Sequence, residues 1–454
     1  MNITIIGAGE VGYHIASRLS RENNDVVLID KSADRIKYVF ENLDVKTIHG
    51  SGSSPNILKE AGIESSDMLI AVADSDEINM MACLFANMLS PHTIKIARIR
   101  NPEFLGNPRI FSPDFLNIHL IINPEVEVVK TVLRLMEVPG ASDVIDFAEG
   151  KVKLVGIKVL ATSPMAGLKL RELDKKGLNH EILIAAIVRG NQMIIPRGED
   201  TIMSNDLVYV VTEKKKTPRV LKLFGKKGEP VHRVLIIGGG SIGTTLATEL
   251  EKRHIHVKII EKDTERCTYL AEQLEKTVVL EGDGTDQALL QEENVQDMDF
   301  VMSATGDQEN NVLISLLAQG LGARKTITRI DKFSYIPLAS TIGLDIIVSP
   351  RLSAVSTILQ YTRRGRILSV VPLKGEDAEA IEVLAMETSD IVGSPLRKIK
   401  FPKGAIIAAI VRKDEVIIPS GESVIAPQDR IIIFSSKESV PEVEKALMVK
   451  LEYF

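Results

Sequence analysis

The feature that most constrains this chain is an internal repeat that runs through the whole sequence. The stretch ITIIGAGEVG at 3–12 returns as VLIIGGGSIG at 234–243, which raises each position number by 231. Further on, IAAIVR at 184–189 recurs at 407–412, which raises the numbers by 223. Two blocks in the order A-B-A′-B′ describe a two-domain unit that has been duplicated, so each block must fold twice.

Length and composition are consistent with several folded domains. The chain has 454 residues, of which 44% are hydrophobic and 26% are charged, as in an ordinary soluble globular protein. A net charge of −6 and an aromatic fraction of 4% do not favour nucleic-acid binding. No apolar run approaches the roughly 20 residues that span a bilayer, and no signal segment precedes the first expected strand. The two cysteines are each expected to be a buried, reduced thiol, so we expect a cytoplasmic protein.

Block A alternates apolar strands with amphipathic helices, beginning with ITIIG, VGYHIASRLSR, DVVLID and ADRIKYVFENL. This alternation predicts a parallel sheet with helices on both faces. Helices are expected at 125–137 and 351–363, each directly after a proline. Block B is richer in strands, such as ILIAAIVR and DLVYVVT. The predicted fold class is α/β, with two Rossmann-like doubly wound parallel-sheet domains, each followed by a small strand-rich α+β domain.

The repeat also sets the expected domain boundaries. The Rossmann-like domains are expected at 1–140 and 232–366, and the strand-rich domains at 141–213 and 367–454. The stretch 214–231 contains proline, glycine and many lysines, so we expect an exposed linker there.

Each half carries a G-x-G-x-x-G motif between its first strand and first helix. In the first half, Gly7 permits the tight turn, Gly9 lets the backbone approach a pyrophosphate, and Gly12 lets helix and strand pack closely. The helix N-terminus then offers free N–H groups and a partial positive charge. The residues expected to bind a nucleotide through these turns are Gly7, Ala8, Gly9, Glu10, Val11 and Gly12, and Gly238, Gly239, Gly240, Ser241, Ile242 and Gly243.

An acidic residue follows each glycine motif at the end of the second strand. Asp30 follows Gly12, and Glu261 follows Gly243, at the same spacing in both halves. An acid at this position accepts hydrogen bonds from ribose hydroxyls and repels a 2′-phosphate, which favours NAD over NADP. It does not separate NAD from ATP or ADP, which carry the same ribose.

Two further pairs of residues recur near the ends of the fourth strands. Ala73-Asp74 in the first half matches Ala304-Thr305 in the second, and carboxyl ends of parallel strands face the ligand crevice. Asp74 and Thr305 are also expected to be the N-caps of the helices that follow.

The offset of 231 pairs other polar residues. It pairs Asp76 with Asp307 and Asn79 with Asn310. It also pairs Arg98 with Arg329, at the ends of the fifth strands, where a guanidinium group can reach a phosphate or form an ion pair at an interface.

No catalytic group accompanies these two sites. A dehydrogenase needs an acid or base beside the nicotinamide, and block B offers no shared histidine, no Ser-His-Asp order and no HExxH motif. The two cysteines, Cys83 and Cys267, lie far apart in the sequence, so no metal site is expected. Two nucleotide sites without a reacting group suggest that the protein is a sensor and not an enzyme.

The chain resembles the TrkA family, the peripheral NAD-binding subunits of Trk potassium-uptake systems. The resemblance is carried by GAGEVG at 7–12, LID at 28–30, the glycine-rich end of the third strand and the Ala-x-x-Asp-x-x-Asn stretch at 73–79. It covers nearly the whole chain. The A blocks are similar to potassium-transport nucleotide-binding domains, also called regulator-of-conductance N domains, and the B blocks to their C-terminal partners.

The resemblance implies a regulatory role at the cytoplasmic side of the membrane. It implies that the protein binds NAD(H), and in some members ATP or ADP. It further implies a homo-oligomeric ring beneath a membrane potassium-translocating subunit of the TrkH/TrkG type, whose pore the nucleotide biases. The ligand-binding residues that it carries over are Gly7 to Val11, Asp30, Ala73, Asp74 and Arg98, and Gly238 to Ile242, Glu261, Ala304, Thr305 and Arg329.

The first half departs from the family pattern at the end of its third strand. The family motif is Gly-Asp-x-Thr/Ser, and the second half keeps it with Gly282, Asp283 and Thr285. The first half has Ser51 where the aspartate is expected. The two sites therefore need not bind the same nucleotide.

Two other functions remain open from the sequence. One is a dehydrogenase with an unrecognised substrate domain, for which steady NADH consumption would be diagnostic. The other is a soluble sensor for a different ion transporter, which the copurifying membrane protein would reveal. In each case, Asp30→Arg is expected to abolish nucleotide binding at the first site while leaving the fold intact.

Overall fold

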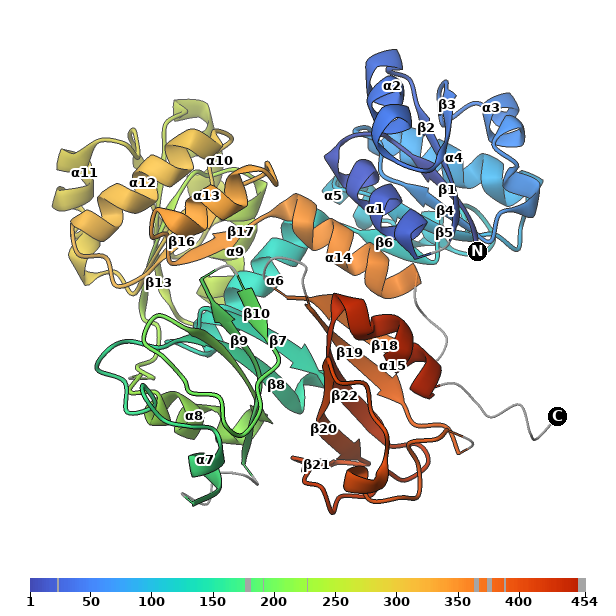
Figure 1. The fold of residues 1–454 in the computed structure, drawn as a ribbon. Helices are drawn as coiled ribbons and strands as arrows, with labels where there is room; N and C mark the ends of the chain where they lie inside the picture. The colour runs from blue at the N-terminus through green and yellow to red at the C-terminus, as the bar shows by residue number, and fades with distance from the viewer. Residues whose placement is uncertain are drawn as a thin grey trace. The chain divides into compact units, whose positions relative to one another are not determined.

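A computed structural model describes residues 1–22, 24–175, 181–190, 192–226, 228–362, 367–373, 378–387 and 389–447. The chain divides into two units, and each unit draws on both halves of the repeat (Figure 1). Unit 1 consists of residues 1–130 and 234–361, and unit 2 of residues 131–233 and 362–454. None of the helices in the described part of the chain is long and apolar enough to cross a membrane.

The first sheet of unit 1 has six parallel strands in the order β3-β2-β1-β4-β5-β6. The strand order reverses between β1 and β4, and this reversal opens a crevice at the carboxyl ends of the strands. The elements of this half are β1 (Asn2–Ile6), α1 (Glu10–Arg21), β2 (Asp25–Asp30), α2 (Ala33–Asn42), β3 (Lys46–His49), α3 (Pro55–Glu60), η1 (Ile63–Ser65), β4 (Met68–Ala71), α4 (Asp76–Leu89), β5 (Ile94–Arg98), α5 (Pro102–Leu105), η2 (Pro108–Phe111), β6 (Leu120–Ile122) and α6 (Pro124–Glu137).

The second sheet of unit 1 repeats this arrangement in the order β14-β13-β12-β15-β16-β17. Its elements are β12 (Arg233–Ile237), α9 (Ser241–Lys252), β13 (His256–Glu261), α10 (Thr264–Gln273), β14 (Val278–Glu281), α11 (Gln287–Glu292), η5 (Val295–Asp297), β15 (Phe300–Ser303), α12 (Gln308–Gly320), β16 (Thr326–Arg329), α13 (Tyr335–Thr341), β17 (Ile346–Val348) and α14 (Pro350–Thr362). Two doubly wound parallel sheets confirm the predicted α/β class.

One face of the first sheet is completed by a helix from the second half. Ala354, Val355, Ile358 and Leu359 of α14 belong to the same buried cluster as β1 and α1 residues such as Ile15. The apolar positions of α14 recur one and four residues apart, so they form one helical stripe that buries against this face. The repeat in the sequence suggested two self-contained domains, whereas the halves of unit 1 share a core.

Unit 2 contains two antiparallel sheets, β10-β9-β11-β8-β7 and β18-β19-β22-β20-β21. Their elements, from the first half and then the second, are β7 (Asp143–Phe147), η3 (Ala148–Gly150), β8 (Val152–Lys158), α7 (Arg171–Lys175), β9 (Ile182–Arg189), β10 (Gln192–Ile194), β11 (Leu207–Glu213), η4 (Lys214–Lys216), α8 (Thr217–Leu223), β18 (Ile367–Pro372), β19 (Ala378–Leu384), η6 (Leu396–Lys398), β20 (Ala405–Arg412), β21 (Glu415–Ile417), β22 (Arg430–Ser436), η7 (Lys437–Ser439) and α15 (Val440–Leu447).

The two sheets of unit 2 share an apolar core. Phe147 and Tyr209 from the first half and Phe434 from the second are fully buried in one cluster. Alanines from both halves also belong to this core, at positions 185, 186, 378, 380, 408 and 409. Because this core contains side chains from both sheets, unit 2 is also built from both halves of the repeat.

The expected linker at 214–231 is wrong over its first part. Residues Thr217–Leu223 form helix α8, and Val220, Leu221 and Phe224 are buried. The many lysines favoured an exposed linker, but the apolar residues of this stretch form one buried helical face. The segment therefore packs as part of unit 2 and is not a tether in solvent.

The shared core of unit 1 predicts that a mutation in the second half destabilises the first. Ile358→Ala is expected to cost about 2–5 kcal/mol, because it opens a cavity against α1 and β1. Hydrogen exchange would detect this as faster exchange of the α1 and β1 amides.

The exposed Leu338 offers the control, since Leu338→Ala removes a side chain that is 61% accessible and should change stability by less than about 0.5 kcal/mol. If Ile358→Ala accelerated exchange only in the second half, the shared core would be disproved.

Candidate nucleotide-binding site

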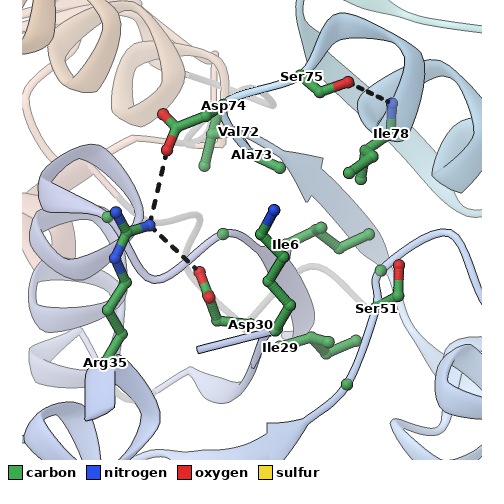
Figure 2. A pocket seen from close by; sticks show the side chains of 15 residues that line it. Ile6, Ile29, Asp30, Arg35, Ser51, Val72, Ala73, Asp74, Ser75 and Ile78 are labelled. Carbon is green, nitrogen blue, oxygen red and sulfur yellow. Dashed lines mark hydrogen bonds and ion pairs between the residues drawn. The ribbon is translucent and has the colours of Figure 1, made fainter. Parts of the chain in front are cut away.

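A pocket of about 250 Å³ opens at the carboxyl ends of β1, β2, β3 and β4 in the first half (Figure 2). Its walls are the glycine turn after β1, the start of α2 and the loops that follow β3 and β4. Six of the residues predicted from the sequence line it, namely Gly7, Gly9, Asp30, Ser51, Ala73 and Asp74. The crevice therefore forms where the strand order reverses, as expected for a dinucleotide-binding sheet.

The glycines of the turn are required by its backbone. Gly7 has a φ of +102°, and a Cβ atom there would lie 2.9 Å from the backbone of Ala73. A Cβ on Gly12 would lie 1.8 Å from the carbonyl oxygen of Gly7. The second half repeats this geometry, since a Cβ on Gly243 would lie 2.1 Å from the Gly238 oxygen. Both helices can therefore begin close to their strands, with their amide groups directed at the crevice.

The acid at the end of the second strand is hydrogen-bonded to the glycine turn. The amide of Ala8 donates to Asp30 Oδ2 over 2.6 Å, and the amide of Ser32 donates to Oδ1 over 2.8 Å. The carboxylate of Asp30 is buried by these contacts. In the second half, the amide of Gly239 donates to Glu261 Oε2, also over 2.6 Å.

A cation that the sequence reasoning missed lies over the first glycine turn. Nη1 of Arg35 is 3.7 Å from Asp30 Oδ2 and 3.6 Å from Asp74 Oδ2, and Figure 2 shows its side chain between the two acids. The same nitrogen lies 3.7 Å from where a Cβ atom of Gly9 would be. Arg35 recurs as Arg266 at the offset of 231, so the repeat itself contained the signal for it.

Two arginines form hydrogen bonds with Asp74. Arg98 Nη2 donates to the carbonyl of Ala73 over 2.8 Å and to Asp74 Oδ1 over 3.2 Å. Arg100 Nη2 donates to the backbone carbonyl of Asp74 over 2.6 Å. Partial burial acts to raise the pKa of Asp74, but Arg98, assisted by Arg35 and Arg100, outweighs burial and holds that pKa below its usual value. Asp74 is therefore a fixed negative charge at the edge of the pocket.

A buried asparagine joins the ends of β4 and β5. Asn79 Oδ1 accepts from the amide of Ala73, and its Nδ2 donates to the carbonyls of Ala73 and Arg98, all within 3.0 Å. In the second half the same contacts are made by Asn311. The predicted pairing of Asn79 with Asn310 is therefore wrong by one residue.

The predicted helix N-caps are also wrong, since Asp74 lies one residue before the true cap and Thr305 lies two residues before it. The caps are Ser75, which accepts from the amide of Ile78, and Asp307, which accepts from the amide of Asn310. Asp74 and Thr305 lie outside the helices. From the third strand to α12 the offset between the halves is 232 instead of 231, so Ala73 corresponds to Thr305 and not to Ala304.

Further pairs follow from the corrected alignment. Asp76 corresponds to Gln308, since Asp76 accepts from the amides that follow β5 and Gln308 accepts from those that follow β16. The pairing of Asp76 with Asp307 is therefore also wrong. An extra residue between the second helix and the third strand of the second half accounts for the shift.

The second half has the same frame around its glycine turn, with different side chains beside it. Arg266 donates to the Gly239 carbonyl over 2.8 Å and to Thr244 Oγ1 over 3.0 Å, so its partners there are neutral. Lys262 Nζ lies 3.0 Å from Asp283 Oδ2 at the end of β14. Hydrogen bonds from the hydroxyl and the amide of Thr285, and from Lys262, lower the pKa of Asp283 to about 2.

The largest difference concerns the loop after the fourth strand. Asp74 in the first half corresponds to Gly306 in the second, which has no side chain. Arg100 corresponds to Asp331, whose carboxylate binds Arg329 through two hydrogen bonds of 3.0 and 2.8 Å. Arg329 therefore forms a local ion pair, whereas Arg98 supports an acid that faces the pocket.

Several predicted residues do not direct their side chains into a crevice. Val11, Ile242 and Ala304 are buried in the core. The side chain of Glu10, at the start of α1, forms an ion pair with Arg351 of α14. Within the described ranges, no group of three or more acidic, histidine or cysteine side chains could hold a metal ion.

The corrected alignment predicts which asparagine supports the second crevice. Asn311→Ala should destabilise the ends of β15 and β16 by about 1–3 kcal/mol, because buried backbone groups lose their partners. Asn310→Ala should have little effect, since Asn310 is exposed. Thermal unfolding and hydrogen exchange would measure both, and equal effects of the two substitutions would contradict the corrected alignment.

Comparison with known proteins identifies the family. The TrkA-N domain family matches residues 3–124 and 234–350, and the TrkA-C domain family matches 154–225 and 380–448. The Trk system potassium uptake protein TrkA of Halomonas elongata is 39% identical over 458 residues, covering 100% of both chains. TrkA homolog 1 of Methanosarcina mazei is 41% identical, covering 98% of this chain and 99% of its own.

A solved structure shares the fold. The structure of the GsuK channel bound to NAD has a TM-score of 0.60 at 17% identity and covers 98% of this chain and 78% of its own. Full-length identities of 39% and 41%, with both domain types matched in both halves, show that this chain belongs to the TrkA family of Trk system potassium uptake proteins.

Proposed function

We propose that this chain is a cytoplasmic regulatory subunit that binds NAD(H), ATP or ADP and controls a membrane potassium-uptake subunit. The observation that carries the proposal is the duplicated cradle, in which a glycine turn, a helix N-terminus and an acid recur with the same 2.6 Å hydrogen bond. The names of the relatives identify potassium as the transported ion. The structure of the GsuK channel bound to NAD makes NAD a candidate ligand for this fold.

The proposal includes that the chain is not an enzyme. The acids of the first pocket are Asp30, which is occupied by backbone amides, and Asp74, whose lowered pKa makes it a weak base. Efficient proton transfer needs a group with a pKa near the working pH. These side chains are suited to binding and not to acid–base chemistry.

Nucleotide binding would affect the rest of unit 1 through contacts at the start of α1. Phosphates at this N-terminus would lie beside Glu10, whose ion pair with Arg351 joins the first half to α14. A ligand shifts a conformational equilibrium only through its different affinities for the two states. A coupling of about 1–3 kcal/mol, which is typical of allosteric proteins, would change pore opening about 5- to 150-fold.

The partners would be further copies of this chain in a ring and a separate potassium-translocating membrane subunit. Met81 on α4 and Leu313 on α12 are equivalent at the offset of 232, and their exposed fractions are 38% and 46%. Leu316 and Met88 extend the exposed apolar side chains on these helices. Apolar side chains that recur on one helix of each half are suited to contacts between copies.

Calorimetric titration tests the proposed ligands. The intact chain should bind adenine nucleotides at two sites. Gly240→Leu should remove binding at the second site, because a Cβ there meets nothing within 4 Å and the side chain can fill the crevice without distorting the fold. Gly9→Leu is the matched variant for the first site. The absence of binding with NAD⁺, NADH, ADP and ATP alike would overturn the proposal.

Ion flux tests the proposed regulation. With the cognate membrane subunit in vesicles, adding this chain should make potassium flux depend on the nucleotide, about 5-fold or more. The double variant Gly9→Leu/Gly240→Leu should bind the membrane subunit and lose this dependence. Nucleotide-dependent flux that persisted in the double variant would contradict control through the two crevices.

A further inference from the structure

We propose that Asp74 sets the ligand preference of the first pocket, favouring a dinucleotide over a nucleoside triphosphate. The inference deepens the proposed nucleotide-binding function and rests on it. A dinucleotide places a neutral ribose beyond its pyrophosphate, whereas ATP places a charged terminal phosphate there. A fixed carboxylate at this position accepts hydrogen bonds from ribose hydroxyls and repels a phosphate.

The position of Asp74 follows from the strand order. If the adenosine ribose lies over Asp30 at the end of β2, the phosphates lie at the start of α1, between β1 and β4. The group beyond the phosphates then falls over the loop after β4, where Asp74 lines the pocket from the side opposite Asp30 (Figure 2). Its side chain is 80% exposed, so a ligand can reach it.

The carboxylate of Asp74 is held in place and charged. Arg98 binds one of its oxygens, and Arg100 holds its backbone carbonyl. Arg35 lies 3.6 Å from the other oxygen and close to Gly9, where the phosphates are expected. A pyrophosphate can therefore draw Arg35 away from Asp74, while Arg98 keeps the acid in position. A terminal phosphate would then meet a carboxylate with one cation fewer beside it.

The second crevice serves as an internal control. Gly306 occupies the position of Asp74, so this loop presents no carboxylate to a ligand. Asp331 faces Arg329 and is neutralised by it. Arg266 already has neutral partners and needs no acid to be displaced. The second crevice therefore lacks the feature that would exclude a triphosphate.

Exchanging the two residues tests the inference. Asp74→Gly is measured in the Gly240→Leu background, so that the first pocket alone binds, and Gly306→Asp in the Gly9→Leu background. Affinities for NADH and ATP are measured calorimetrically without magnesium. Asp74→Gly should raise the affinity for ATP relative to NADH about tenfold, and Gly306→Asp should lower that ratio by a similar factor.

The conservative variant Asp74→Asn separates charge from shape. It should raise ATP affinity as Asp74→Gly does while preserving NADH affinity, because the amide oxygen still accepts a hydrogen bond. Thermal unfolding confirms that each variant folds, and Asp74 is exposed enough that all of them should.

The outcomes distinguish this inference from the proposed function. If each single-site background bound nucleotides but neither exchange changed the ratio of ATP to NADH affinity, the role of Asp74 would be disproved and the nucleotide-binding function would stand. A loss of ATP affinity in Asp74→Gly would also disprove it. If no background bound any nucleotide, the proposed function itself would fail.

Discussion

Both crevices depend on a short hydrogen bond between the backbone of the glycine turn and the acid at the end of the second strand. Asp30 accepts from Ala8, and Glu261 accepts from Gly239, each over 2.6 Å. This contact joins β1 to β2 above the sheet and directs the start of the following helix at the crevice. Because neither Gly12 nor Gly243 carries a Cβ, the helix can lie close enough to its strand for the contact to form.

The duplicated frame allows the two crevices to differ without losing their shape. Backbone contacts and a buried asparagine stabilise the frame in both halves, while the charged side chains around it differ between the halves. The first half has acids on both sides of Arg35, and the second has an acid at Asp283 and none at Gly306. Side chains at strand ends can vary in this way because they lie at the surface and the strands and helices beneath them do not depend on their identity.

Neither unit is assembled from one half of the repeat alone. In unit 1, α14 from the second half packs on α1 of the first, and Arg351 reaches Glu10 at the start of the first cradle. In unit 2, one core contains side chains from both sheets, and Lys151 pairs with Asp414 across the halves. The two halves of the repeat are therefore physically connected in both units, through shared cores and through ion pairs.

The sequence alone determined the elements that local pattern and repetition dictate. The glycine spacing, the alternation of strands and helices and the acids at matching positions after the glycines are sufficient to predict both cradles and the α/β class. The sequence alone did not place Arg35 over Gly9 or bury α8 where a linker was expected. The one-residue shift from Asn310 to Asn311 was present in the sequence, because Ser51 and Asp283 are already 232 positions apart. Only the tertiary structure decided the positions of Arg35 and α8 and the packing of α14 against the first half. These features depend on which surfaces meet in space, and local periodicity carries no information about a helix's partner.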